Sequence, residues 1–179
     1  MEKAIFAGGC FWCTEAFFLD LKGVIEVSPG YTGGHIEYPT YEMICSGTTG
    51  HVEATEIIYN PKIVTYLNLL KVFFDTHDPT QVDGQGNDIG SQYLSVIYFS
   101  NDQQKIEAQR YIEELTNNNN APIVTKLYSE KPFYKAEEYH KNYFNNNRGQ
   151  PYCQIIIEPK YKKFINKFNT LLEKNKTIN

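Results

Sequence analysis

The sequence of 179 residues has no long apolar run and no excess of positive charge. No stretch approaches the ~20 apolar residues that span a bilayer, and the start Met1-Glu2-Lys3 does not lead into a secretory apolar segment. The net charge of -4 and the pI near 5.6 argue against the broad basic surface that holds nucleic acids. We therefore expect a cytoplasmic protein that binds neither membranes nor nucleic acids.

Cysteine is also scarce, with only Cys10, Cys13, Cys45 and Cys153 in the chain. Four cysteines are too few for a disulfide scaffold, so they are expected to be reactive, metal-bound or buried. An aromatic content of 15% excludes a disordered chain. The length favours one domain over residues 1–179.

The hydrophobic pattern predicts an α+β fold that begins with the order β-α-β-β-α-β. The expected strands are residues 3–7, 23–31, 51–59 and 92–99. One helix is expected to start near Cys10, and a second helix is expected over residues 66–74. This order is typical of a ferredoxin-like core, an antiparallel or mixed sheet with helices packed on it.

The remainder of the chain is predicted to add helices to this core. A Ser100-x-x-Gln103 capping box predicts a helix that ends in the asparagine run at residues 117–120. A short turn of helix is expected over 41–45, an edge strand over 123–127, and two C-terminal helices over 136–145 and 161–172.

Cys10 is the first candidate for a reactive residue. It follows Gly8-Gly9 at the predicted start of a helix, where unpaired N–H groups and the helix dipole favour a thiolate and lower its pKa. Together with Cys13 it forms a Cys-x-x-Cys pair, which indicates redox chemistry or zinc. A small buried hydrophobe is the alternative for Cys10. Because the histidines show no tight ligand spacing, we expect no metal and no cofactor.

Glu53 is the second candidate, because alternation places it on the half-apolar face of a predicted strand. Partial desolvation there would raise its pKa and let it donate a proton near neutrality. The alternative is a solvated charge on an edge strand. Asp88 lies in a glycine-rich loop that lacks the lysine of a phosphate-binding loop. Such a long ordered loop is often functional.

Seven short motifs, in this order along the chain, resemble the peptide methionine sulfoxide reductase A family. They are Gly8-Gly9-Cys10-Phe11-Trp12, Gly30-Tyr31-Thr32-Gly33-Gly34, Pro39-Thr40-Tyr41, Gly50-His51-Val52-Glu53, His77-Asp78-Pro79-Thr80, Gln85-Gly86-Asn87-Asp88 and Gln92-Tyr93. The resemblance runs from Gly8 to about Lys160. It implies reduction of the S epimer of methionine sulfoxide, free or in proteins, an enzyme class that repairs oxidised methionine.

The resemblance also implies roles for the candidate residues. Cys10 would attack the sulfoxide sulfur, and Glu53 would protonate the sulfoxide oxygen, which Tyr41 and Tyr93 would hydrogen-bond. The residues implied in substrate binding are Phe11 and Trp12, which would hold the methyl group, with Asp88 and His140, which would order or support the pocket.

After methionine leaves, Cys10 would be a sulfenic acid that a second thiol converts to a disulfide, and thioredoxin would reduce this disulfide. Cys153 is the first choice as the resolving thiol, because the family places a cysteine after a tyrosine near the C-terminus. The polar residues 145–149 before it suit a mobile segment. Cys13, which stands where many members have glycine, is the alternative resolving thiol or a relay. Cys45 is expected to be buried packing.

Two other functions stay open at the level of the sequence. A general thiol–disulfide oxidoreductase would use Cys10 and Cys13 but leaves Glu53 and Asp88 unexplained. A non-catalytic module could hold oxidised peptides in an aromatic pocket. Leu94 stands where the family usually has arginine, so a preference for particular peptides does not transfer.

Overall fold

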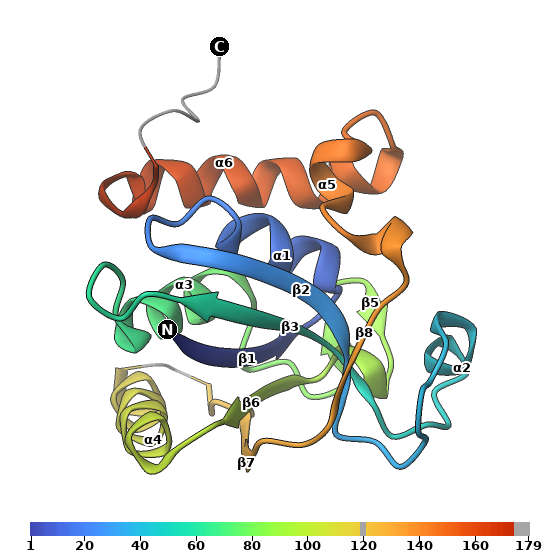
Figure 1. Ribbon diagram of the computed structural model, residues 1–179, viewed down its shortest axis with the longest axis horizontal. Helices are drawn as coiled ribbons and strands as arrows, with labels where there is room; N and C mark the ends of the chain where they lie inside the picture. Colours follow the sequence, from blue (N-terminus) through green and yellow to red (C-terminus); the bar gives the residue numbers. More distant parts are fainter. Residues whose placement is uncertain (119–120, 174–179) are drawn as a thin grey trace.

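A six-stranded mixed sheet forms the centre of the computed structural model, which describes residues 1–118 and 121–173. Its strands are β1 (Glu2–Gly8), β2 (Val24–Thr32), β3 (Val52–Tyr59), β6 (Ser95–Phe99), β7 (Lys126–Ser129) and β8 (Phe133–Lys135). The strand order is β7-β6-β1-β3-β2-β8, with β6 and β7 parallel and all other neighbours antiparallel (Figure 1). A separate two-stranded ribbon pairs β4 (Gly84–Gln85) with β5 (Asp88–Ile89). The α+β class is therefore confirmed.

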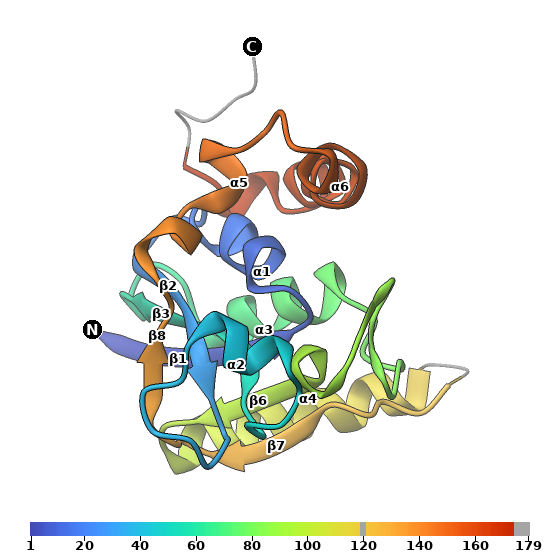
Figure 2. The same ribbon diagram turned by 90° about the vertical axis from the view of Figure 1, so that its right-hand side faces the viewer.

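The α-helices are α1 (Phe11–Phe18), α2 (Tyr41–Cys45), α3 (Tyr66–Thr76), α4 (Asp102–Asn118), α5 (Tyr143–Asn146) and α6 (Glu158–Lys167). Helix α1 lies between the sheet and α6, and α4 packs at the other end of the molecule beside β6 and β7 (Figures 1 and 2). Within residues 1–118 and 121–173, no helix is both long enough and apolar enough to cross a membrane.

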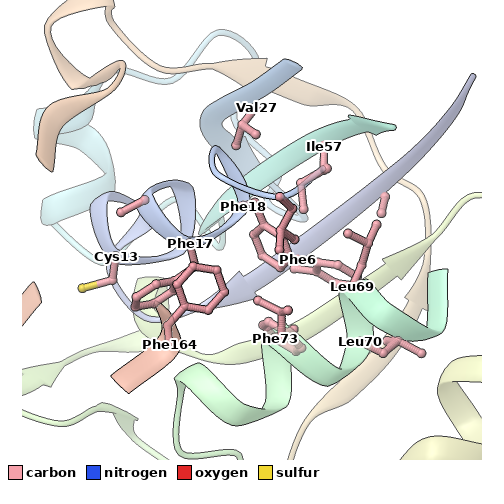
Figure 3. Packing of buried hydrophobic residues seen from close by; sticks show 14 of the residues in the cluster. Phe6, Cys13, Phe17, Phe18, Val27, Ile57, Leu69, Leu70, Phe73 and Phe164 are labelled. Carbon is pink, nitrogen blue, oxygen red and sulfur yellow. The ribbon is translucent and has the colours of Figure 1, made fainter. Parts of the chain in front are cut away.

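Helix α1 is buried along almost its whole length: seven of its eight residues are buried. Phe17 and Phe18 point from it into the main core, where the ring of Phe6 on β1 stacks on Phe73 of α3 at 4.9 Å (Figure 3). The sulfur of Cys13 points away from this aromatic cluster. A helix that is apolar on all sides belongs inside a protein, so this one carries its N-terminus into the interior.

The structure corrects several sequence expectations. Helix α4 is capped one residue later than the predicted box, because the Gln104 N–H donates to Asn101 Oδ1 at 2.9 Å and Gln104 Oε1 accepts from Ser100 N at 3.0 Å. The predicted end of that helix includes residues 119–120, which lie outside the described part of the chain.

The predicted helix over residues 136–145 is wrong. This segment holds a short 3₁₀ turn (Glu138–His140) followed by the four-residue α5, and the two are separated by Asn142 with φ 51°. A left-handed residue interrupts a helix. The last helix also begins and ends earlier than expected, as a π-helical turn (Cys153–Ile157) that continues into α6.

Candidate active site

Cys10 is placed by a glycine turn between β1 and α1. Gly9 has φ +90°, and a Cβ at that position would lie 2.6 Å from Gln85. Only glycine fits there without strain. Cys10 is then the N-cap of α1, and its carbonyl accepts the N–H of Cys13 at 3.1 Å. Its side chain is 9% exposed, and all four cysteines of the chain are free thiols.

The pKa of Cys10 differs from the sequence expectation. Burial raises the pKa well above its usual value, and the nearby acidic groups of Glu53 and Cys13 act in the same direction. The backbone N–H of Trp12 and the hydroxyl of Tyr152 oppose this shift. The helix N-terminus acts in the expected direction, but the depth of α1 outweighs it. Cys10 is therefore a protonated thiol in the substrate-free protein.

Glu53 lies on β3, opposite Tyr31 of β2, and is 2% exposed. Its Oε2 accepts the backbone N–H of Phe11 at 3.0 Å, which places the carboxyl beside the first turn of α1. Burial raises the pKa of Glu53 to about 8, although the Phe11 N–H opposes the shift. The solvated edge-strand alternative is wrong, because β3 is paired on both sides. At neutral pH this carboxyl holds a proton.

Aromatic rings and His140 border the same turn of α1. The indole Nε1–H of Trp12 donates to His140 Nδ1 at 3.0 Å. The His140 ring centre lies 5.0 Å from that of Phe11 and 4.5 Å from that of Tyr41, and Tyr143 stacks on Trp12 at 3.7 Å. The structure thus brings Phe11, Trp12 and Tyr41 together around a buried imidazole.

His140 is a neutral imidazole whose two ring nitrogens face Trp12 and Glu137. Burial lowers its pKa, so the ring is neutral. Because Nδ1 accepts from Trp12, the proton of the neutral ring lies on Nε2. Within the described residues, His140 Nε2 is buried and makes no hydrogen bond, but it lies 3.7 Å from Glu137 Oε2. The imidazole therefore lies between the indole of Trp12 and the carboxylate of Glu137.

Tyr93, Asp88 and Tyr152 complete the surroundings of Cys10. The Tyr152 hydroxyl donates to Asp88 Oδ2 at 2.6 Å, and it opposes the rise in the pKa of Cys10 and of Cys13. Burial and then the proximity of the Glu53 carboxyl raise the pKa of Tyr93 and the pKa of Tyr41. Both tyrosines therefore remain hydrogen-bond donors close to Glu53.

Two glutamates that sequence reasoning missed hold the site together. Glu137 accepts the Tyr31 hydroxyl and the Tyr41 N–H, both at 2.8 Å. Glu15 accepts the Asn142 N–H at 2.7 Å, and burial raises the pKa of Glu15 to about 7. The sequence offers one indication of Glu15, because it is the only charged residue in a predicted helix that is otherwise mostly apolar. No comparable signal marks Glu137.

The remaining cysteines occupy three different environments. Cys13 lines a small cavity together with Cys10, and burial raises its pKa to about 12. Cys153 begins the π-helical turn inside the main apolar cluster and is 0% exposed. It does not line the cavity at Cys10. Cys45 is exposed, so the expectation of buried packing is wrong.

The segment before Cys153 forms a hydrogen-bonded turn. The Gln150 N–H donates to the Asn147 carbonyl at 2.9 Å, and the Arg148 guanidinium lies over the Phe144 ring at 4.3 Å. Arg148 also forms an ion pair with Glu158 at 3.3 Å. The polar composition of this segment therefore builds the turn.

Comparison with known proteins gives one consistent result. A family model described as peptide methionine sulfoxide reductase matches residues 2–172. The peptide methionine sulfoxide reductase MsrA of Chromobacterium violaceum is 49% identical over 175 residues, which is 97% of this chain and 99% of that protein.

Solved structures agree with this result. Reduced Mxr1 from Saccharomyces cerevisiae is 32% identical, with a TM-score of 0.80, and the match covers 85% of this chain and 88% of that one. Mxr1 in complex with Trx2 is a more distant match, with 23% identity, a TM-score of 0.57 and coverage of 79% and 84%, and it shows similarity of fold.

Proposed function

Since the chain belongs to the peptide methionine sulfoxide reductase family, whose members are oxidoreductases, we propose that it reduces the S epimer of methionine sulfoxide, free or in proteins, at Cys10. One observation carries this proposal. A buried thiol at the start of α1 lies beside a buried carboxyl, Glu53, that keeps its proton at neutral pH. The thiol supplies a nucleophile and the carboxyl supplies an acid.

In the first step the Cys10 sulfur attacks the sulfoxide sulfur while Glu53 gives its proton to the sulfoxide oxygen. The thiol proton of Cys10 returns to Glu53. The attack forms a bond between the two sulfurs, and the oxygen then leaves the substrate sulfur as water with a further proton from Glu53. A water attacks the Cys10 sulfur, the bond between the two sulfurs breaks with its electron pair going to methionine, and the spare proton returns to Glu53, so that methionine and a Cys10 sulfenic acid form. The oxygen is a poor leaving group without a proton, which is why an acid with a pKa of about 8 suits this step better than an ordinary glutamate.

The aromatic side of the site would hold the substrate. Phe11 and Trp12 would contact the methyl group on sulfur, and Tyr41 and Tyr93 would donate to the oxygen as it gains charge. His140 would support the pocket through its hydrogen bond with Trp12, and Asp88 would order it through Tyr152.

A second thiol of the chain would then convert the sulfenic acid to a disulfide, which thioredoxin would reduce. The family resemblance gives Cys153 this role, and its position inside a π-helical turn is compatible with opening, because such turns occur often at functional sites. The complex of Mxr1 with Trx2 supports a thioredoxin as the reductant.

We propose in addition that residues 1–179 form one domain around a ferredoxin-like core. The order β6-β1-β3-β2, with every pair antiparallel and with α1 and α3 between strands in the chain, supports this arrangement.

The test is turnover of each epimer of methionine sulfoxide with dithiothreitol as reductant. We expect methionine from the S epimer and none from the R epimer, and we expect no activity in Cys10→Ser. Equal or preferred turnover of the R epimer contradicts the proposal. A protein that reduces disulfides but releases no methionine would instead be a thiol–disulfide oxidoreductase, and binding of oxidised peptide unchanged in Cys10→Ser without turnover would indicate a binding module.

A further inference from the structure

We propose that Cys13 is the first thiol to capture oxidised Cys10, forming a disulfide across the first turn of α1, and that Lys160 assists this step. The inference rests on the proposed reduction at Cys10. It assigns Cys13 a place before Cys153, which receives the disulfide from Cys13 afterwards.

The geometry of the helix start brings the two sulfurs together. Cys10 is the N-cap and Cys13 is the third residue of the helix. The side chains at these two positions converge, as they do in a capping box, where each reaches toward the backbone of the other. The Cys13 N–H bond to the Cys10 carbonyl at 3.1 Å closes this turn. Cys-x-x-Cys pairs at helix starts form disulfides in redox proteins.

The two thiols also share one enclosed space. Both line a cavity of about 10 Å³, together with polar side chains that include Asp88 and Lys160. This volume is about that of one water molecule. The Tyr152 hydroxyl opposes the rise in the pKa of both thiols, as expected for a group that lies near the two of them.

Lys160 is the positive group that favours attack by Cys13. Burial raises the pKa of Cys13 to about 12, and the Lys160 ammonium is the strongest influence in the opposite direction. The thiolate is the reactive form of a cysteine. Lys160 is half-buried and lines the cavity, whereas the neighbouring Lys163 is exposed and lines only the adjoining outer groove. The two lysines therefore form a matched pair for a test.

Cys153 is less well placed for the first capture. It belongs to the main apolar cluster, is 0% exposed and lies outside the cavity shared by Cys10 and Cys13. A turn of π-helix would have to open before its sulfur moves. Cys13 needs no such movement, so it reacts first.

The chemistry balances without an outside oxidant or reductant. The Cys13 sulfur attacks the Cys10 sulfur of the sulfenic acid, the S–S bond forms and the S–O bond breaks. The oxygen leaves with the Cys13 proton as water. Cys153 then attacks the Cys13 sulfur, which gives a Cys13–Cys153 disulfide and returns Cys10 as a thiol that takes the Cys153 proton.

The experiment follows one turnover of the full-length protein with one equivalent of the S epimer and no reductant, stopped at successive times with a thiol-alkylating reagent. Dimedone traps Cys10 sulfenic acid, and mapping of the tryptic peptide 4–22, which contains both cysteines, detects an internal bridge. We expect this bridge to be the first disulfide in the wild type and in Cys153→Ser. In Cys13→Ser, sulfenic acid should persist at least about tenfold longer. The inference is overturned if a Cys10–Cys153 bridge forms in Cys13→Ser and its rate of formation equals the rate at which sulfenic acid decays in the wild type.

Variants of Lys160 and Lys163 test whether the charge of Lys160 speeds the attack of Cys13 on Cys10. Lys160→Met should slow the appearance of the internal bridge about threefold to tenfold at pH 7 to 8. Lys160→Arg should restore it, and Lys163→Met should behave as the wild type. Equal effects of Lys160→Met and Lys163→Met contradict the role of Lys160.

Methionine measured in the same samples separates the two proposals. One equivalent of methionine from Cys13→Ser shows that this variant is folded and that Cys10 reacts. Full methionine release without an internal bridge in the wild type overturns the inference on Cys13 alone. No methionine from the wild type overturns the proposed function itself.

Discussion

The first turn of α1 and the rest of the same helix are both buried, yet burial has opposite effects on them. In the second half, Phe17 and Phe18 pack against rings such as Phe6, and burial of these apolar side chains stabilises the fold. In the first turn, the same depth surrounds the thiol of Cys10 and the carboxyl of Glu53, whose charged forms become costly. The comparison shows that burial of one helix stabilises the apolar core at its second half and keeps the carboxyl of Glu53 protonated beside its first turn.

The largest expected effect comes from removing the titrating carboxyl of Glu53, which lies on β3 beside the first turn of α1. Glu53→Gln keeps the size of the side chain but has no proton to give. We expect release of methionine in a single turnover to slow by about 10² to 10⁴-fold, the usual cost of a lost general acid. Rapid-quench measurement of methionine at pH 7 checks this. A rate within about threefold of the wild type would exclude Glu53 as the proton donor.

A change in the second half of the helix should act on stability instead. Phe18 is 0% exposed and lies 5.6 Å from the ring of Phe6. Phe18→Ala should lower the free energy of unfolding by about 3 to 5 kcal/mol, through lost burial and the cavity left behind. Urea unfolding measures it. In the molecules that remain folded, the pH midpoint of methionine release should stay that of the wild type, and a moved midpoint would break the separation between the two regions.

Glu53→Gln should also have a stability effect with a definite sign. The pKa of Glu53 is about 8 in the folded protein and about 4.5 in an exposed chain, so folding favours its neutral form. Its contribution to stability is fully present below pH 4.5 and is lost as pH rises through 8. Relative to wild type, Glu53→Gln should therefore gain about 2 to 4 kcal/mol between pH 5 and pH 8. Unfolding curves whose difference does not change with pH would contradict this.

The smallest expected effect concerns the indole N–H of Trp12. Trp12→Phe keeps an aromatic ring beside Tyr143 but removes the hydrogen bond to His140 Nδ1. A hydrogen bond of this kind contributes about 0.5 to 1.5 kcal/mol, so kcat/KM for the S epimer should fall about twofold to tenfold. A loss above a hundredfold would mean that the indole N–H takes part in the chemical step.

The positions of the two central residues could be predicted from the sequence because local signals determine them. The glycine pair before Cys10 marks the end of a strand and the start of a helix, and strand alternation assigns Glu53 to the inward face of β3. These patterns depend on near neighbours in the chain. The strands and long helices of the sheet core were predictable for the same reason.

Properties that depend on distant contacts could not be predicted. The raised pKa of Cys10 follows from the depth at which α6 and the sheet enclose α1, which no local pattern reports. The left-handed Asn142 is held by Glu15 from another element, so the apparent helix over residues 136–145 is broken by tertiary structure. The burial of Cys153 is equally a consequence of packing between distant segments.

The most direct test of the account is the pH dependence of methionine release in a single turnover with the S epimer, for the wild type and Glu53→Gln between pH 6 and pH 10. If a protonated Glu53 with a pKa of about 8 supplies the proton, the wild-type rate is full below that pH and falls as pH rises through it. The Glu53→Gln rate should be low and lack this fall. A wild-type rate that instead rises from pH 8 to pH 10, in parallel with Glu53→Gln, would show that thiolate formation alone limits the reaction and would contradict the account.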